Sequence, residues 1–322
     1  MKTAPAGFLS RLNNQPYVLI GLSTLMWGGN VIAGRLAVGQ ISPMSVTCLR
    51  WFIVCLLFSV MLRRQLLAEW PIVQPYVRKL ALLGGIGFTL FNALFYVGAQ
   101  YTTAVNMAVL QGTFPALVIL GMAVLFGAAI TPVQALGVLV TFCGVAIIAS
   151  KGEIATLLTL SFNRGDVLLL IATMIFAGYT IGLRDRPKAS GLVVFAVLAT
   201  AAFMTSVPFL ATEILMGASY WPSFKGICVL IYAAIGPSLL AQVFYLRGVE
   251  LIGPSRTGVF YNLVPLFGAL LAVIILGEPF HLYHAIAFVL VLGGIWLAER
   301  KSVRGMAKAA TICEGEKLRS EK

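Results

Sequence analysis

Residues 260–279 read FYNLVPLFGALLAVIILGEP. The stretch is apolar enough to lie in hydrocarbon, yet it contains an amide at Asn262 and a proline at Pro265, and it stops at Gly277. A proline inside a helix removes one backbone hydrogen bond and clashes with the preceding turn. Because lipid offers no replacement partner, the freed carbonyl groups need protein or a wet cavity around them. The stretch therefore predicts a membrane helix that is broken where it faces away from lipid.

The composition of the whole chain agrees with a membrane protein. Of 322 residues, 60% are hydrophobic and 11% are charged, and the mean hydropathy is +0.95. Soluble domains carry about 25% charged residues, so a soluble fold would leave too little polar surface to face water. The net charge of +12 comes from basic residues that fall between apolar runs and form no stripe with aromatic residues, which argues against a nucleic-acid partner.

Apolar runs long enough to cross a bilayer of ~30 Å recur along the chain. They cover residues 17–37, 44–62, 79–98, 104–126, 132–150, 166–183, 190–211, 225–247, 254–276 and 281–298. With the N-terminus placed inside, 18 of the 23 Lys and Arg residues fall on the inner side. The positive-inside rule then predicts a multi-pass protein of the cell (inner) membrane with both termini cytoplasmic. Residues 1–16 form a cytoplasmic segment without a cleavage site, and residues 299–322 a disordered cytoplasmic tail.

The chain contains an internal repeat. Residues 110–129, LQGTFPALVILGMAVLFGAA, align with the opening stretch at an offset of 150, so that Pro115 meets Pro265 and Gly127 meets Gly277. At an offset of 149, WGGNVIAGR (27–35) meets FAGYTIGLR (176–184). The sequence therefore predicts an all-α membrane protein of two five-helix repeats, residues 17–150 and 166–298. Because five spans are an odd number, the second repeat enters the membrane from the opposite side.

The two prolines lie at matching depths, Pro115 about 16 Å from the outer face of the membrane and Pro265 about 16 Å from the inner face. We therefore expect helix breaks at Pro115 and Pro265 that meet around a central cavity. Polar and aromatic residues at mid-depth are the candidate lining of this substrate cavity. They are Trp27, Asn30, Asn92, Tyr96, Gln111, Tyr179, Gln242, Tyr245, Tyr261 and Asn262.

Each of these residues has a plainer interpretation. The amides serve equally well for hydrogen bonds between helices, and Tyr96, Gln242 and Tyr245 lie near span ends, where an interfacial role is open. The other four tryptophans fit an interfacial belt. They are Trp51, Trp70, Trp221 and Trp296.

Charged residues are expected at the span ends, and no acid lies at mid-span, so the sequence offers no buried carboxylate as a proton relay. Arginines near span ends are expected to extend to the headgroups, with a substrate carboxylate as the alternative partner of Arg35 or Arg184. These arginines are Arg35, Arg50, Arg184, Arg247 and Arg256. His281 and His284 have no carboxylate or cysteine at ligand spacing except Glu278, so no metal and no cofactor is expected. Gly137, Thr141 and Gly144 permit close helix approach, either within one chain or in a dimer.

Short motifs at corresponding repeat positions resemble a known family. They are MWGGN (26–30), YTTA (101–104), IGPS (252–255) and LGEP (276–279). Together with the inverted repeat, they resemble the ten-helix EamA-type exporters of the drug/metabolite transporter superfamily, over nearly the whole chain. The resemblance implies a substrate cavity between the inner helices, with spans five and ten at the periphery. It also places Trp27 and Asn30 in the first-helix signature, and it is closest to exporters of amino acids, including aromatic ones.

We therefore expect a transporter that exports amino acids or similar small amphipathic metabolites by alternating access, without an obligatory proton relay, as a monomer or homodimer. A nucleotide-sugar or other metabolite antiporter is an alternative, but it requires deep cations that the span centres lack. A membrane-embedded enzyme or a non-transporting scaffold is the alternative from another class. The sequence contains no catalytic motif such as HExxH or GxSxG.

Overall fold

A computed structural model describes residues 14–153, 163–253, 257 and 260–298 of the chain. Throughout these residues the regular structure is helical, as expected for a membrane protein. Eight helices are long and apolar enough to cross a bilayer, and two shorter apolar helices, Leu263–Leu276 and Leu282–Ala298, complete the ten predicted spans. The predicted N-terminal segment to residue 13, the tail and part of the start of the ninth span lie outside the described residues.

The first repeat follows the predicted spans closely. Its helices are α2 (Pro16–Ala37), α3 (Pro43–Met61), α5 (Val77–Gly84), α6 (Phe91–Gly98), α7 (Ala104–Gln111), α8 (Phe114–Phe126) and α9 (Pro132–Ala149). Short 3-10 and π segments, η1 (Gln74–Tyr76) and η2 (Gly85–Leu90), join α4 (Arg63–Val73), α5 and α6. Proline at the start of α2, α3, α8 and α9 fits a first helical turn, where its missing N–H costs nothing.

The second repeat has the same order of spans. Its elements are α11 (Arg164–Gly182), η3 (Leu183–Asp185), α12 (Gly191–Leu215), α13 (Phe224–Ala233), η4 (Ala234–Leu240), α14 (Ala241–Ile252), α16 (Leu263–Leu276) and the helix Leu282–Ala298. α13, η4 and α14 form the eighth span, as α5, η2 and α6 form the third.

One helix was not predicted. Residues 63–73, expected to be a loop, form α4 (Arg63–Val73), on which Leu67, Trp70 and Ile72 are exposed beside Arg63 and Arg64. Exposed apolar residues next to basic ones are typical of a helix that lies in the membrane interface. The stretch is too short for its pattern of apolar residues to distinguish such a helix from a loop.

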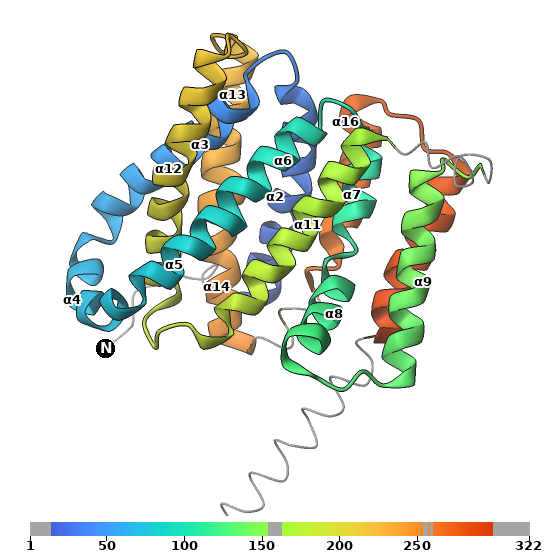
Figure 1. The fold of residues 1–322 in the computed structure, drawn as a ribbon, viewed down its shortest axis with the longest axis horizontal. Coiled ribbons are helices and arrows are strands. Elements are labelled where there is room, and N and C mark those ends of the chain that lie inside the picture. Colours follow the sequence, from blue (N-terminus) through green and yellow to red (C-terminus); the bar gives the residue numbers. More distant parts are fainter. Residues whose placement is uncertain (1–13, 154–162, 254–256, 258–259, 299–322) are drawn as a thin grey trace, which may run out of the picture.

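The two repeats run in opposite directions through the bundle. Arg35, near the end of α2, donates a hydrogen bond to the carbonyl oxygen of Ala99, directly after α6. Gly98 at the end of α6 also lies beside Gly165 at the start of α11. Hence α2 ends on the side where α11 begins, which we call the upper side because it is uppermost in Figure 1.

The packing of the central helices is pseudo-symmetric. α2 packs against α14 and α16, and its counterpart α11 packs against α6 and α8, which are the counterparts of α14 and α16. The backbones of α2 and α16 come close at Gly28, where an added Cβ would lie 2.9 Å from the backbone nitrogen of Gly268. The first span of each repeat thus packs on the third and fourth spans of the other repeat, at the centre of the bundle.

Both predicted interruptions coincide with helix boundaries. α7 ends at Gln111 and α8 begins at Phe114, with Pro115 in its first turn. In the ninth span a turn at residues 261–262 precedes α16, which carries Pro265 in its first turn. α8 and α16 then end alike at Gly127 and Gly277, whose φ angles of 63° and 65° lie in the left-handed region that glycine adopts without strain.

A second symmetric irregularity escaped prediction. η2 and η4 are π-helical segments in the third and eighth spans, and they correspond at the offset of 149 that relates the repeats. A π-segment widens the helix and releases carbonyl groups from the regular ladder, and such segments often lie at functional sites. η4 contains Pro237, which explains its local loss of α-helical bonding, whereas the sequence of η2 contains no proline.

The fifth and tenth spans pack on each other at one edge of the molecule, where Figure 1 draws α9 beside the last helix. A Cβ added to Gly137 would lie 2.5 Å from the carbonyl oxygen of Gly294, and one added to Gly144 would lie 2.9 Å from that of Ala287. The small residues of α9 therefore serve packing within one chain. This decides between the two roles left open by the sequence.

Candidate functional site

Trp27 lies on α2 and contacts the second repeat. Its indole Nε1 donates a hydrogen bond of 3.0 Å to the carbonyl oxygen of Pro237 in η4. Its ring lies 5.2 Å from that of Tyr245 on α14 and 5.6 Å from that of Tyr261, measured between centroids. These distances are those of favourable aromatic pairs. The π-segment thus supplies the carbonyl group that orients the tryptophan.

The aromatic contacts continue from one repeat to the other. Tyr261 lies 4.9 Å from Phe114 on α8, Phe114 lies 5.4 Å from Phe176 on α11, and Phe176 lies 5.4 Å from Tyr179. We call these six residues the aromatic cluster: Trp27, Phe114, Phe176, Tyr179, Tyr245 and Tyr261. All except Tyr179 stay partly exposed although helices of both repeats meet here. Phe114 and Phe176 were not among the predicted cavity residues, although Phe176 is the repeat counterpart of Trp27.

The predicted amides occupy different surroundings. Asn30 Oδ1 and Gln111 Nε2 are buried, and neither has a hydrogen-bond partner among the described residues. Asn262 is the residue that precedes α16, and Gln242 lies partly buried in the first turn of α14. Unsatisfied buried polar atoms are costly and call for an explanation such as water or a ligand. Asn30 and Gln111 are therefore suited to meet a polar group of a bound molecule.

Asn92 and Tyr96 do not stand alone, because both bind Arg50. Arg50 Nη1 donates hydrogen bonds of 2.9 Å to Asn92 Oδ1 and of 2.9 Å to the Tyr96 hydroxyl. Arg50 Nε and Nη2 donate to Ser238 Oγ at 2.9 and 2.6 Å. The guanidinium group is thereby held between α3, α6 and η4, and both repeats supply its partners.

The expectation that Arg50 extends to the headgroups is wrong. The residue is only 4% exposed. It is the eighth residue of α3, about 10 Å from the start of the helix, a distance that the long side chain could span. However, it points toward α6 and η4, where protein surrounds it. No single span signals this, because the partners are brought together by three helices that are distant in sequence.

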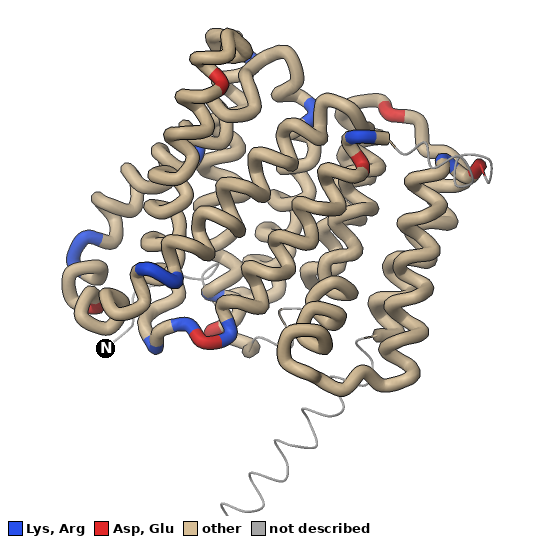
Figure 2. The backbone as a smooth tube through the Cα atoms, viewed as in Figure 1, with Lys and Arg blue, Asp and Glu red and all other residues tan. Residues whose placement is uncertain are grey.

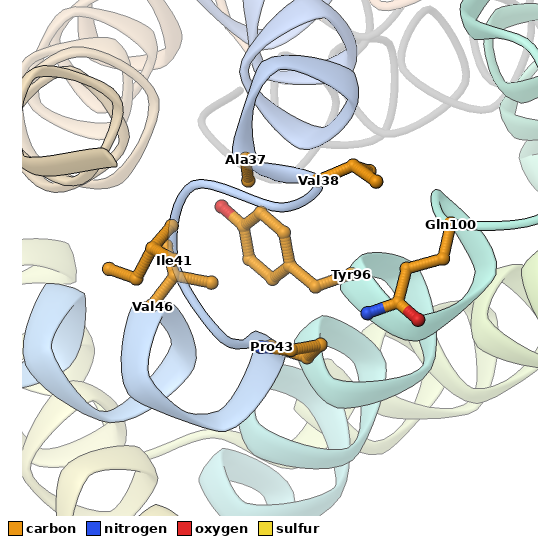
Figure 3. A pocket seen from close by; sticks show the side chains of 7 residues that line it. All are labelled: Ala37, Val38, Ile41, Pro43, Val46, Tyr96 and Gln100. Carbon is orange, nitrogen blue, oxygen red and sulfur yellow. The ribbon is translucent and has the colours of Figure 1, made fainter. Parts of the chain in front are cut away.

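A narrow pocket opens beside Tyr96 at the upper side. Its walls are the α2–α3 connection and the end of α6, and Figure 3 shows the Tyr96 ring in its middle and the Gln100 amide at its side. The lining residues are Ala37, Val38, Ile41, Pro43, Val46, Tyr96 and Gln100. Since the Tyr96 hydroxyl also binds Arg50, this one side chain contacts both the pocket and the buried guanidinium. Tyr96 is thus no interfacial residue.

Comparison with known proteins shows to which family this architecture belongs. Residues 15–150 and 163–299 each match the model of the EamA-like transporter family. The chain belongs to this family.

Several relatives that are named as uncharacterized transporters match this EamA-like chain over nearly their full length. The chain is 30% identical over 294 residues to the uncharacterized transporter YyaM of Bacillus subtilis, covering 87% of this chain and 92% of the relative. It is 27% identical over 297 residues to an uncharacterized transporter of Archaeoglobus fulgidus, covering 90% and 99%. A solved crystal structure superposes with a TM-score of 0.58 at 21% identity, covering 87% of this chain and 96% of that one, which supports the fold alone.

The protein is therefore an EamA-family membrane transporter and not an enzyme. The predicted resemblance is confirmed at the level of the family, and two EamA repeats account for the duplication. The relatives' names state no substrate, so they do not test the predicted substrate class, amino acids.

The charged residues of this EamA-like transporter gather at its two ends, as Figure 2 shows. Three carboxylates close helix N-termini, where they satisfy free N–H groups. Glu278 accepts bonds from the backbone N–H groups of Ala104 and Val105 at the start of α7 (2.9 and 3.0 Å). Glu213 accepts from Met44 N (3.1 Å) and Glu69 from Ser190 N (2.6 Å).

Two further arginines find partners within the protein. Arg35 Nε lies 3.8 Å from a Glu278 carboxylate oxygen, and the Arg184 guanidinium lies 5.0 Å from the centre of the Phe126 ring. Both are contacts with the other repeat. Arg35 is therefore engaged by Glu278 and by Ala99 instead of reaching the headgroups. Arg35 is thus already paired with a carboxylate in this conformation, whereas Arg184 is exposed and contacts a ring face.

Trp51 also differs from its expected place in an interfacial belt. It is 3% exposed and stacks on Phe88 of η2, with ring centroids 4.7 Å apart. By contrast, Trp70, Trp221 and Trp296 are well exposed, as a belt residue would be. Trp51 follows Arg50 in the sequence, and both side chains are buried in the protein.

Proposed function

We propose that the protein exports amino acids or similar small amphipathic metabolites across the cell membrane by alternating access of its two repeats. The observation that carries this proposal is the set of contacts from Trp27 to Pro237, Tyr245 and Tyr261, which joins the first repeat to the second beside both helix interruptions. A substrate bound here would touch both repeats and would feel any movement of one against the other.

The chemistry of the aromatic cluster supports an amphipathic substrate. Ring faces provide large apolar contact and attract cationic groups such as an ammonium. The buried Asn30 Oδ1 and Gln111 Nε2 offer one acceptor and one donor that no described residue uses. A side chain on the rings and polar groups on the amides would satisfy both halves of the site.

The contacts at the upper side, together with the expected orientation, indicate which side of the membrane this conformation closes off. At the upper side, Ser42 Oγ donates to Glu213 (2.6 Å) and Ser223 N donates to the Gln40 carbonyl oxygen (2.9 Å), both between the repeats. Together with Arg35 and Glu278, these contacts hold the upper ends of the repeats together. If the termini are cytoplasmic, as the loop charges predict, this conformation is closed to the outside and loads from the cytoplasm.

Coupling to protons is absent from this proposal. Among the described residues, Asp166 is a buried carboxylate and Glu278 a partly buried one, and each lies at a span end with hydrogen-bond partners. Proton-coupled carriers usually place a titratable group inside the membrane. We therefore propose facilitated efflux down the substrate gradient.

Counterflow in proteoliposomes tests this function. Vesicles loaded with unlabelled phenylalanine or leucine are expected to accumulate the radiolabelled amino acid at a rate that does not change when an imposed pH gradient is collapsed. Flux that disappears with the pH gradient would contradict the uncoupled mechanism. Absence of counterflow for a full panel of amino acids would contradict the substrate class.

The nucleotide-sugar or other metabolite antiporter remains an alternative because Arg50 is a buried cation that sequence reasoning placed at the surface. A single guanidinium matches one carboxylate better than the several charges of a diphosphate. Competition by UDP-glucose in the same counterflow assay would favour the alternative.

A further inference from the structure

Arg50 carries a positive charge that the described residues do not neutralise. Arginine cannot be deprotonated in a protein, and a buried charge without a counter-charge is costly. Its hydrogen-bond partners, Asn92, Tyr96 and Ser238, are neutral side chains. The ion pairs found among the described residues are those of Arg35 with Glu278 and of Arg247 with Glu250, and neither includes Arg50.

Three acids at the upper side are engaged elsewhere. Glu278 and Glu213 cap α7 and α3, and Asp166 accepts a hydrogen bond from the Thr102 hydroxyl. A rearrangement that brought one of them to Arg50 would leave a helix terminus or a buried hydroxyl unsatisfied. The missing negative charge must therefore come from outside this part of the protein.

The other repeat shows that the fold itself does not require a cation at this place. The position equivalent to Arg50 at the offset of 149 is Ala199 on α12. There, α12 meets η2 through neutral groups: the Thr89 hydroxyl lies 2.8 Å from the Ala202 carbonyl oxygen and 2.7 Å from the Thr205 hydroxyl. Thr89 is itself the equivalent of Ser238. The same interface is thus closed once by hydroxyl groups and once by a guanidinium group, so packing alone does not explain Arg50.

The position of Arg50 relative to the aromatic cluster is fixed by η4. Arg50 binds the side chain of Ser238, and Trp27 binds the carbonyl group of the preceding residue, Pro237. Adjacent Cα atoms are about 3.8 Å apart, so a single short segment positions both the charge and the ring. The four hydrogen bonds of Arg50 also leave one of its five N–H donors for a further acceptor.

From these observations we infer that Arg50 is the anion-binding group of the transport site and takes the carboxylate of the substrate. The inference rests on the proposed function and narrows it to substrates with an apolar body and a carboxylate, such as zwitterionic or acidic metabolites. A carboxylate binds arginine through charge-assisted, often bidentate hydrogen bonds, which are about twice as strong as those to neutral acceptors. It therefore replaces Asn92 or Ser238 as an acceptor.

Binding at Arg50 also affects the contact between the repeats. Asn92 and Tyr96 belong to the first repeat, and Ser238 belongs to the second. A carboxylate that takes over the donors now directed at Ser238 releases the α3–η4 contact. Substrate binding at this group is thus coupled to separation of the repeats.

Binding of simple probes to the purified full-length protein tests the inference. Phenylacetate and phenylacetamide have nearly the same shape but differ in charge. We expect phenylacetate to raise the thermal unfolding temperature in detergent in a saturable manner, and phenylacetamide to bind at least tenfold more weakly. Arg50→Gln abolishes this preference, and Arg50→Lys retains it with lower affinity, because lysine keeps the charge but loses the planar fork. Arg63→Gln is the matched control, because Arg63 is exposed on α4.

Equal binding of the two probes to the wild type, or an unchanged preference in Arg50→Gln, overturns the inference. If Arg50→Gln does not fold, the Arg50→Lys variant and the comparison of the two probes on the wild type still decide.

Counterflow separates this inference from the proposed function. A wild type that transports phenylalanine and phenylalaninamide equally well retains the proposed function and refutes the role of Arg50. A wild type that binds phenylacetate through Arg50 but transports no amino acid retains the anion site and refutes the substrate class.

Discussion

Arg35 and Glu278 lie 3.8 Å apart across the boundary between the two repeats, and the Glu278 carboxylate also closes the N-terminus of α7. In the other repeat, Arg184 is the counterpart of Arg35 and contacts the ring of Phe126, while the counterpart of Glu278 is Ala128. Only the upper side therefore has an ion pair at this position. The contacts that hold the two repeats together thus differ in strength between the two ends of the molecule.

Glu278→Gln is expected to weaken the closed upper side. The variant loses the ion pair, and its single amide oxygen replaces only one of the two carboxylate acceptors, so one helix N–H group loses its partner, a loss of about 1–3 kcal/mol. We therefore expect a lower unfolding temperature in detergent. Glu153→Gln is the control, because Glu153 is exposed. Equal behaviour of the two variants would show that Glu278 does not hold this end.

Trp27→Ala is expected to impair transport without preventing membrane insertion. The variant removes two aromatic contacts and the hydrogen bond to Pro237. At about 0.5–1.5 kcal/mol for each aromatic pair, we expect counterflow to fall at least tenfold, while Trp27→Phe retains part of it. Trp221→Ala serves as the control, because Trp221 is 95% exposed. Unchanged counterflow in Trp27→Ala would place the substrate elsewhere.

Gly294→Ala is expected to destabilise the pairing of α9 with the last helix. The added Cβ would lie 2.5 Å from the Gly137 carbonyl oxygen, so the backbones must separate. Overpacking of this kind costs about 1–3 kcal/mol. The neighbouring Gly293→Ala meets nothing within 4 Å and should leave the unfolding temperature unchanged or slightly raised. A similar decrease in both variants would refute the close contact as the cause.

The orientation of the chain is testable by cysteine labelling in a cysteine-free variant. Glu153 and Lys188 are exposed, Glu153 after the upper end of α9 and Lys188 after the lower end of α11 (Figure 1). We expect an impermeant maleimide to label Glu153→Cys in intact cells, and Lys188→Cys only after permeabilisation. The reverse pattern would invert the predicted topology and, with it, the side of the membrane that this conformation closes off.

The sequence predicts the spans well because membrane helices are defined by length and apolarity, which are local properties. The repeat and the interruptions near Pro115 and Pro265 follow from internal comparison of the sequence, and Gly127 and Gly277 end their helices in the same conformation. The π-segments η2 and η4 could not be predicted in this way. Their residues are as apolar as those of the adjoining α-helices, and η2 lacks a proline.

The charged part of the candidate site was missed for a different reason. Depth along α3 alone makes Arg50 look able to reach the headgroups, because it does not reveal the direction of the side chain. That direction depends on Asn92, Tyr96 and Ser238, which come from other helices and, for Ser238, from the other repeat. The absence of a charge at Ala199, the equivalent position, was nevertheless visible in the sequence. An arginine that breaks the internal symmetry is a signal that a repeat alignment can detect.

The pairing of α9 with the helix Leu282–Ala298 constrains how the molecule can move. One helix belongs to each repeat, and their backbones nearly touch at Gly137 and Gly294. For the proposed alternating access, we expect this edge to act as the pivot and the displacement of the helices to grow with distance from it. The largest excursions fall on the far edge, around α4 and α12 (Figure 1), where a spectroscopic distance label would record the stroke with the greatest amplitude.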